Sequence, residues 1–365
     1  MKAAVLTKLN APLEVLNLTL PDHLEYGQVL VQVLVSGICG AQLQEMKGEK
    51  GCKRIGGYLV DPYIPHLMGH EGCGMVESVG PGVTRVKPGD KVVMHWRKAD
   101  GVEAACPKYS WWKALPGFRR SVCSRHMTEI PVGGGRVTTL CEKAVVSENR
   151  VTPVPPDTSP ELCALLGCSL STALGTVERE ARVKQGESVL IVGTGGLGCN
   201  LIKAALLAHA HPIVAMDIHP GKRKTALALG ATAYVDALKD DLSKVGKFDV
   251  VIDTAGAGRS MESTLPLLAA SGRFILVGHP APGQDVPIRN ADHLFEGEGK
   301  LVKATQGGGF LPHLDIPRYV RLWESGALDI SGIVTHRLPL RLVNQGIEKV
   351  KAGNASRVLI DMSLK

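Results

Sequence analysis

A cysteine and a histidine–glutamate pair are the first residues in the chain whose types and placement suggest chemistry. Cys39 ends the strand-like run "VLVQVLVSGIC", and His70 and Glu71 lie in "PHLMGHEGCG". Thiolate sulfur, imidazole nitrogen and carboxylate oxygen are all ligands of metal ions such as zinc. Because the three side chains lie where strand-like segments begin or end, we expect a metal site there.

A glycine-rich turn later in the chain has the spacing of a dinucleotide-binding loop. The segment "VLIVGTGGLG" places Gly193, Gly195 and Gly198 in G-x-G-x-x-G order, after a buried strand and before a helix. The first glycine permits a tight turn, the second lets a pyrophosphate approach, and the third lets the helix pack on the strand. The free N–H groups of the helix N-terminus favour an anion. We predict that this turn, which also contains Gly196 and Leu197, binds the cofactor.

The acidic residue Asp217 decides which dinucleotide the turn takes. It ends the next strand, "VAMD", 24 residues after Gly193. A carboxylate there accepts hydrogen bonds from the ribose diol of NAD and repels the 2′-phosphate of NADP. The cations of "GKRK" argue for NADP, but they follow the next turn and are expected on a helix. We therefore predict NAD, and an NADPH-dependent carbonyl or enoyl reductase is the alternative.

Two kinds of element must position these residues. Up to about residue 155, short β-branched runs alternate with Gly, Pro and Asp turns, which predicts an antiparallel sheet or barrel. The proline-rich stretch "VTPVPPDTSPE" and a buried helix in "LCALLGCSLSTALGTV" follow. From about residue 187, strands such as "SVLIVG", "PIVAMD" and "RFILVGH" alternate with helices such as "SMESTLPLLAASG". This order is typical of a doubly wound parallel sheet, and the tail "SRVLIDM" could return to the first domain.

The distribution of charge bears on the possible partners. The 365 residues carry a net charge of +7, and residues 95–126 alone hold seven Lys and Arg against two Asp and Glu, a net of +5, among Trp96, Trp111 and Trp112. Such a segment can be a solvated loop or subunit contact, or can bind an anionic substrate or nucleic acid. No nucleic-acid motif accompanies it, so we predict no nucleic-acid partner. No run of 18 apolar residues occurs, which predicts no membrane span.

The nine cysteines indicate a reducing setting. They are scattered, form no CxxC pair and are odd in number. A chain of this length needs no disulfides to stabilise its core. We therefore expect reduced thiols in a cytoplasmic protein, with some of the cysteines functional.

Taken together, these segments resemble the zinc-dependent medium-chain alcohol dehydrogenases over nearly the whole chain. The resemblance rests on "GHEGCGMVESVGPGVTRVKPGDKVV", "GCSLSTALGTV", "GTGGLG" and the tail "GIVTHRLPL…GIEKVKAGNASRVLI". It implies a β-rich, GroES-like catalytic domain of residues 1–158 and 305–365, and a doubly wound α/β Rossmann domain of residues 159–304. It also implies an NAD-dependent enzyme in which zinc acts as a Lewis acid while an alcohol gives a hydride to NAD⁺.

The family pattern implies a set of zinc ligands. It places Cys39, His70 and Cys168 around one catalytic zinc, and a Cys₂His set of this kind leaves one coordination position open. Glu71 matches a carboxylate that lies beside the zinc and approaches or ligates it.

The same pattern implies a substrate pocket next to Trp96, which aligns with an aromatic residue that often walls it. His95 and Arg97 flank this residue. The alternatives are that Trp96 belongs to the core and that Arg97 is a solvated surface residue.

The resemblance also implies cofactor contacts beyond the glycine turn. Asp217 and Lys222 match the contacts to the adenosine ribose. Arg357, in "NASRVL", matches an arginine that meets the pyrophosphate. Val277 and Gly278 lie at the end of a strand whose backbone usually meets the nicotinamide.

The residues after the first zinc ligand depart from the family pattern. Many members have a Ser or Thr that takes the substrate proton, then an Asp, and often a His two residues further on. Here Ala41 cannot carry a proton, Gln42 has no charge and Gln44 does not titrate. The proton could leave through ordered water or a substrate hydroxyl, or through His95 or Glu71, or the site could be inactive.

A second departure lies after "GDKVV", where many relatives hold a structural zinc with four closely spaced cysteines. This chain has Cys106 and Cys123, 17 residues apart. We therefore predict one catalytic zinc for each subunit and no structural zinc.

These features predict a zinc-dependent oxidoreductase that uses NAD and a polar secondary alcohol or ketone, such as a sugar, cyclitol or amino-cyclitol. A non-catalytic NAD-binding protein with a vestigial zinc site is the alternative from another class. The resemblance also suggests a homodimer or homotetramer formed through edge strands of the Rossmann sheet.

Overall fold

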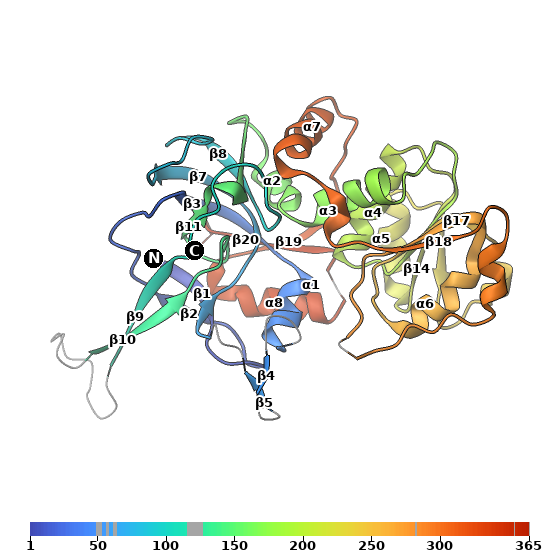
Figure 1. Cartoon of the computed structure of the whole chain (residues 1–365), viewed down its shortest axis with the longest axis horizontal. Helices are drawn as coiled ribbons and strands as arrows, with labels where there is room; N and C mark the ends of the chain where they lie inside the picture. Colours follow the sequence, from blue (N-terminus) through green and yellow to red (C-terminus); the bar gives the residue numbers. More distant parts are fainter. Residues whose placement is uncertain are drawn as a thin grey trace. The chain divides into compact units, whose positions relative to one another are not determined.

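The computed structural model describes residues 1–48, 53–55, 58–60, 64–114, 127–281, 283–353 and 355–364. The chain divides into two compact units (Figure 1). The first unit comprises residues 1–167, 336–351 and 358–365, and the second comprises residues 168–335 and 352–357.

The first unit contains a five-stranded sheet in the order β2-β1-β6-β10-β9. Its strands β9 and β10 form a long antiparallel hairpin in which Met127 faces Ala114 and Gly133 faces Lys108. The bounds are β1 (Lys2–Leu6), β2 (Glu14–Asn17), β6 (His66–Leu67), β9 (Lys108–Ala114) and β10 (Met127–Gly133). A separate small hairpin is formed by β4 (Lys53–Ile55) and β5 (Tyr58–Val60).

The larger sheet of the first unit has the order β12-β8-β7-β3-β20-β19, and β11 also pairs with β3. Val29, Val31, Val92 and Val145 are fully or almost fully buried, because side chains of alternate strand positions point into one shared core. The bounds are β3 (Gln28–Ile38), β7 (Glu71–Val79), β8 (Lys91–His95), β11 (Lys143–Ser147), β12 (Val151–Val154), β19 (Val334–Leu338) and β20 (Arg357–Asp361). The C-terminal tail does return to the first unit, since Val358 of β20 lies opposite Ile38 of β3.

Three helices belong to the first unit: α1 (Gly40–Met46), α2 (Pro160–Leu166) and α8 (Val343–Lys351). Helix α1 follows β3 directly, so the strand-to-helix turn presents Cys39. Helix α2 packs on β3, β7 and β8, and all of its residues from Leu162 to Leu166 are buried.

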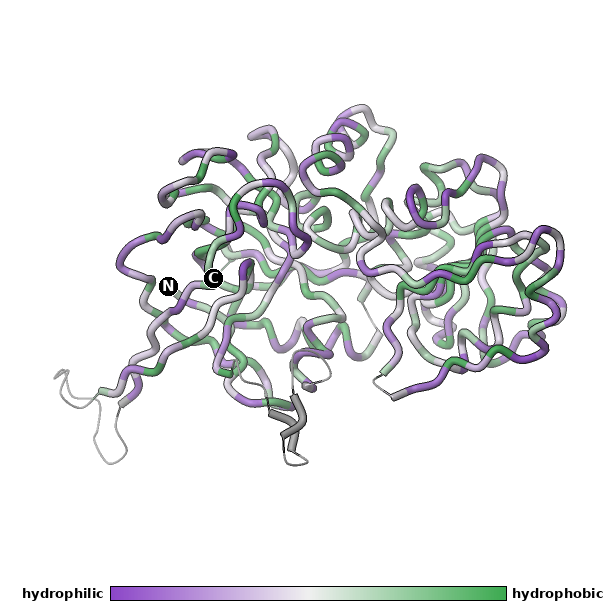
Figure 2. The backbone as a smooth tube through the Cα atoms, in the orientation of Figure 1, coloured by the Kyte–Doolittle hydropathy of each residue, from purple (hydrophilic) through white to green (hydrophobic). Residues whose placement is uncertain are grey.

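The second unit is built on a six-stranded parallel sheet in the order β15-β14-β13-β16-β17-β18. The inner strands β13, β14 and β16 are hydrophobic (Figure 2) and almost wholly buried, because helices of the unit cover this part of the sheet. The bounds are β13 (Val189–Val192), β14 (Ile213–Asp217), β15 (Ala233–Asp236), β16 (Phe248–Asp253), β17 (Leu268–Leu276) and β18 (Leu301–Ala304). The helices are α3 (Ser169–Gly175), α4 (Gly196–Leu207), α5 (Arg223–Ala228), α6 (Gly258–Thr264) and α7 (Pro312–Glu324).

Two predicted helices end or break earlier than expected. The apolar run 162–177 is two helices, α2 and α3, because the backbone bends by 57° between Leu166 and Ser169. The segment predicted as a helix over 260–272 is helical in α6 only to Thr264. A 3₁₀ turn containing Pro266 follows, and β17 begins at Leu268. Proline has no N–H group to continue a helix, which explains the early end.

The compact units differ from the predicted limits at residues 158 and 304. Helix α2 lies with the first unit because it packs on three of its strands. Helix α7 lies with the second unit, where its Asp315 pairs with Arg179 at 2.6 Å. In the part of the chain that the structure describes, no single helix is long and apolar enough to cross a membrane. The bent pair Pro160–Leu166 and Ser169–Glu180 meets that test by length and composition.

Candidate metal centre and dinucleotide site

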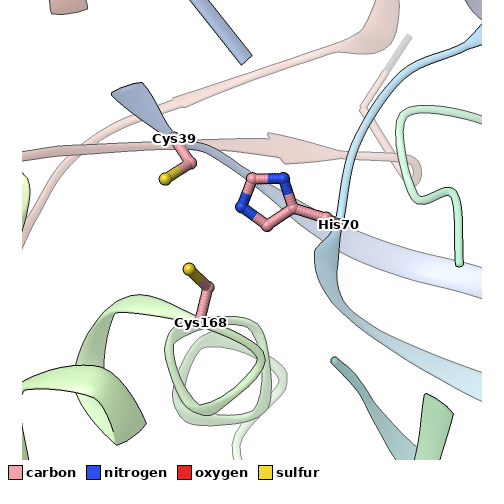
Figure 3. Close-up of side chains that lie close together, drawn as sticks. All are labelled: Cys39, His70 and Cys168. Atoms are coloured by element: carbon pink, nitrogen blue, oxygen red, sulfur yellow. The ribbon is translucent and has the colours of Figure 1, made fainter. Parts of the chain in front are cut away.

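Three of the four predicted metal ligands lie together. The ligand atoms of Cys39, His70 and Cys168 all lie within 4.8 Å of one another, and their side chains converge in Figure 3. Two sulfurs and one imidazole nitrogen at this separation suit a tetrahedral zinc ion with Zn–S bonds of about 2.3 Å and one further position. The donor set therefore fits a zinc ion.

Cys39 is positioned by the turn from β3 into α1. It is the N-cap residue of α1, and its extended backbone ends the strand. Gln42 is 2% exposed, and its Oε1 accepts a hydrogen bond of 2.8 Å from the backbone N–H of Cys39. The uncharged glutamine at this departure from the family pattern thus fixes the backbone of the first ligand.

His70 is positioned by a glycine turn before β7. Gly69 has a φ of +100°, and a Cβ there would lie 2.4 Å from Thr139 Oγ1, so this position requires glycine. Burial lowers the pKa of His70, but the hydrogen bond and charge of Cys39 outweigh this and raise it to about 9. The imidazole of His70 and the thiol of Cys39 therefore interact directly.

Cys168 is positioned by the break between α2 and α3. It is the N-cap residue of α3 and the first residue of the second unit, bonded directly to Gly167 of the first. A Cβ on Gly167 would lie 2.4 Å from Met94 O and 2.8 Å from Glu71 Cα. The break thus occurs where the chain must approach β7 and β8 closely, and a continuous helix would not present the thiol.

Glu71 lies outside the cluster of three ligands. It is fully buried at the start of β7, and a Cβ on Gly37 would lie 2.4 Å from its Oε1. Its carboxylate therefore packs against β3 two residues before Cys39, and its negative charge acts on His70. Direct ligation by Glu71 stays a prediction.

His95 occupies a different environment from the one expected for a proton carrier. It is fully buried, with Nδ1 2.7 Å from Arg97 O and Nε2 2.9 Å from Thr152 Oγ1. Nε2 therefore links β8 to Thr152 of β12, and Nδ1 contacts the turn that follows β8. This geometry favours a structural role, and a relay through His95 stays a prediction.

A cavity of about 500 Å³ in the first unit is lined by His70 and Trp96. Its wall also carries Cys106 and three residues that the sequence did not single out: Glu45, Arg136 and Arg150. Their positions are spread over about 100 residues, so sequence spacing gives no signal for them. The indole of Trp96 thus lies where a substrate of the metal centre could contact it.

The glycine turn leads from β13 into α4 as the motif predicted. A Cβ on Gly198 would lie 1.9 Å from Gly193 O, so glycine alone allows this contact between strand and helix. A Cβ on Gly195 would meet no atom within 4 Å, which leaves open space above the turn. The sheet order changes direction at β13, between β14 and β16, which is where α/β sheets bind ligands.

Asp217 is held as a carboxylate at the end of β14. Its Oδ2 accepts hydrogen bonds from Thr194 N at 2.7 Å and Thr194 Oγ1 at 2.9 Å, and Lys222 Nζ lies 3.0 Å away. Burial raises its pKa, but these donors and the charge of Lys222 outweigh burial and hold the pKa below its usual value. The turn and its acid are therefore connected directly, and Lys222 is the partner of Asp217.

Arg357 lies against the start of α4. A Cβ on Gly196 would lie 3.2 Å from its guanidinium Nη1. A cation beside a helix N-terminus and an open glycine turn fits a pyrophosphate. At the end of β17, Val277 and Gly278 both donate their backbone N–H groups to Asp253 O at 2.9 Å, so their N–H groups serve the sheet. Their contact with a nicotinamide, like the contacts of Leu197, stays a prediction.

The basic segment 95–126 is described in part. Trp111 packs on the core of the first unit, Lys113 Nζ lies 5.4 Å from its ring centroid, and Trp112 is 47% exposed. Cys106 is an exposed free thiol. Cys123, with the rest of 115–126, lies outside the described residues.

Comparison with known proteins agrees with this geometry. A family model described as zinc-binding dehydrogenase matches residues 196–324, and one described as alcohol dehydrogenase GroES-like domain matches residues 25–156. The putative alcohol dehydrogenase D of Mycobacterium tuberculosis is 29% identical over 384 aligned residues, with 98% of each chain covered. The NDMA-dependent alcohol dehydrogenase of Amycolatopsis methanolica is 28% identical, again with 98% of each chain covered.

The solved structures agree on the fold. An alcohol dehydrogenase zinc-binding domain protein from Burkholderia ambifaria has a TM-score of 0.82 and 23% identity, with 100% of this chain and 99% of that chain covered. The predicted fold class, a GroES-like part and a doubly wound parallel part, is confirmed.

Proposed function

The chain belongs to the NAD-dependent, zinc-dependent medium-chain alcohol dehydrogenases, and within that family we propose that it acts on a polar secondary alcohol or its ketone. The substrate class we propose is that of sugars, cyclitols and amino-cyclitols. One observation carries the proposal, namely the lack of a proton-carrying side chain at positions 41, 42 and 44 of α1, directly after the first zinc ligand.

A hydroxyl-rich substrate compensates for this lack. Ala41 has no polar side-chain atom, and the carbonyl oxygen of Gln42 is already used by Cys39 N–H. A positioned proton carrier is typically worth about 10²–10⁴-fold in rate, so a reaction without one needs a substitute. A second hydroxyl on the substrate, or water that it orders, can carry the proton out of the cavity.

Each residue of the site has a separate role in this reaction. Zinc, when bound, supplies the Lewis acid that lowers the pKa of the substrate hydroxyl, and NAD accepts the hydride. Cys39, His70 and Cys168 hold the metal and leave a position open. Trp96 contributes an apolar wall to the cavity beside His70 and limits the water there.

At the cofactor end, Asp217 accepts hydrogen bonds from the adenosine ribose diol and Arg357 neutralises the pyrophosphate. The charged carboxylate of Asp217 argues against the NADPH-dependent reductase that was the alternative. The convergence of Cys39, His70 and Cys168 argues against the non-catalytic alternative, because a vestigial site has no need to keep three ligands in register.

Three further features belong to the proposal. The subunit holds a single zinc and no structural zinc. It assembles as a homodimer or homotetramer through β18, an edge strand whose four residues are all exposed. It works in the cytoplasm, which suits the free thiols of the described cysteines.

The test is NAD-dependent oxidation of a substrate panel by the zinc-loaded protein. The panel contains myo-inositol, glucitol and an amino-cyclitol beside ethanol and benzyl alcohol. We expect the highest kcat/KM for a polyhydroxy compound. Ethanol as the best substrate would contradict the proposal.

A further inference from the structure

The wall of the cavity beside His70 carries charges of both signs. Glu45 lines it, and the charge of Glu45 acts on His70. Arg136 and Arg150 also line it, and the charge of Arg136 helps to lower the pKa of Arg150. The wall therefore holds one acid whose charge reaches His70 and a pair of arginines.

The two arginines are undercompensated by the described residues. Arg136 Nε pairs with Glu103 at 2.7 Å, but the other oxygen of Glu103 pairs with Lys98 at 3.2 Å. Arg150 donates to the uncharged carbonyl of Trp96 at 2.9 Å. Three cations thus share Glu103, and the charged side chains that line the cavity itself, Arg136, Arg150 and Glu45, carry a net of +1.

Partial burial of Arg150 makes this excess positive charge unfavourable. Arg150 is partly buried, and desolvation together with the charge of Arg136 lowers its pKa while Glu103 opposes the effect. Two guanidinium groups near one another in a cavity repel, and an anion between them removes the repulsion. Guanidinium groups also bind carboxylate and phosphate oxygens in a bidentate way, which gives a site of this kind specificity.

We propose that Arg136 and Arg150 bind an acidic group of the substrate, a carboxylate or a phosphate, while its reacting hydroxyl lies at the His70 end. This inference rests on the proposed function and narrows it, because it selects acidic polyhydroxy compounds and disfavours the amino-cyclitols. The arginines act by binding and orienting the substrate, away from the reacting atoms.

Binding is tested first without turnover. Cys106 is exposed, lines the same cavity and lies close enough to Arg150 for their charges to interact. We would measure its alkylation by iodoacetamide, peptide by peptide, in zinc-loaded protein with millimolar inorganic phosphate or with sodium chloride of equal ionic strength. Phosphate should slow the alkylation of Cys106 several-fold.

The variants assign this protection to the two arginines. Arg136→Gln and Arg150→Gln should each abolish most of the protection, and Arg150→Lys should keep part of it. Arg321→Gln removes an equal charge from an exposed position on α7 and should leave protection unchanged. Because Arg150 also supports Trp96 O, the thermal unfolding of each variant is measured alongside, and Arg136→Gln tests the site without touching that bond.

Turnover then tests the substrate class. We would compare gluconate with glucitol, and glycerol 3-phosphate with glycerol. The acidic member of the better pair should have a kcat/KM about 10- to 100-fold higher, the range of a charge-assisted hydrogen bond. Arg150→Gln should remove this advantage mainly through KM, and the pair that shows it distinguishes carboxylate from phosphate.

The outcomes separate this inference from the proposed function. Turnover of neutral polyols with no acidic preference and no protection by phosphate would overturn the inference and leave the proposed function standing. Protection that depends on both arginines, with no oxidation of any alcohol, would support the anion site and refute the proposed function. Protection lost equally in Arg321→Gln would overturn the anion site.

Discussion

The glycine turn and the metal centre differ in how far apart their residues lie in the sequence. The turn and its acid come from one strand–helix–strand segment, residues 189–217, and Thr194 N binds Asp217 directly. The metal centre takes its ligands from positions 39, 70 and 168, at a helix start, a glycine turn and a helix break. The first site is therefore local, and the second depends on the packing of three separate segments.

The two sites also differ in how closely the neighbouring residues match the family pattern. Within the turn, a Cβ on Gly198 would lie 1.9 Å from the backbone oxygen of Gly193, so this position accepts glycine only. Around the metal centre, Ala41, Gln42 and Gln44 depart from the family pattern while the ligands stay in place. The cofactor end thus matches the motif, and the segment after the first metal ligand departs from it.

The largest expected effect is the loss of zinc and activity when one ligand of the metal centre is removed. Cys168→Ser should reduce zinc from one ion per subunit to almost none, and activity should fall about 10³-fold or more, since the metal stabilises charge by several kcal/mol. NAD binding should persist, because the turn does not depend on this residue. Metal analysis and NAD titration by fluorescence check both. Cys106→Ser should retain its zinc, and a comparable loss there would contradict the assignment.

The next effect concerns the cofactor end alone. Asp217→Asn should lower the NAD-to-NADP ratio of kcat/KM by about 10- to 100-fold, because a charged acceptor is lost and Lys222 is released for a phosphate. The pKa of Asp217 lies below its usual value of 3.8, so the wild-type preference should persist as the pH falls to that value. Asp329→Asn, at an exposed carboxylate, is the matched control. An unchanged ratio in Asp217→Asn would refute the role of this residue.

A pair of glycine variants distinguishes fold from binding within the turn. Gly198→Ala forces a Cβ to 1.9 Å from Gly193 O and should lower the free energy of unfolding by roughly 1–3 kcal/mol. Gly195→Ala meets no protein atom, so it should unfold at the wild-type temperature and yet bind NAD more weakly. Differential scanning calorimetry and NAD titration report the two properties. Equal NAD affinity in Gly195→Ala and wild type would show that no ligand approaches there.

The smallest expected effect is a change in kcat when proton-carrying side chains are introduced after Cys39. Ala41→Ser combined with Gln44→His introduces the proton carriers that many relatives have. We expect kcat for a simple alcohol to rise by about 10-fold, toward the lower end of what a positioned carrier contributes, and kcat for a polyol to change little. Gln44→Asn alone provides the control. An equal gain on both substrates would mean that the polyol supplies no proton path.

The glycine turn was easier to predict from the sequence than the metal centre, because the turn is local and the metal centre depends on long-range contacts. The turn could be predicted from Gly193 to Asp217 because its requirements are local backbone ones. The cluster could be predicted through the family resemblance, whereas the residues alone indicated Cys39 and His70 without their third partner. The break before Cys168 was predicted as one helix, because the close approach of Gly167 to Met94 and Glu71 is a long-range contact.

The arginines of the cavity wall could not be predicted from the sequence. Arg136 and Arg150 belong to no motif, and both line the cavity. Ser147 N donates to Arg136 O at 2.8 Å, which joins the loop after β10 to the segment that leads to Arg150. His95 was expected near the chemistry from its neighbour Trp96. Successive residues point to opposite sides of an extended chain, and the structure places His95 in the core.

The most direct test of the account is X-ray absorption at the zinc edge on the purified protein, with the zinc content measured on the same sample. We expect one zinc per subunit with two sulfur ligands, one imidazole and one light atom, and loss of one sulfur in any zinc that Cys168→Ser retains. A zinc bound by four sulfurs, or wild-type protein that binds no zinc when reconstituted, would contradict it.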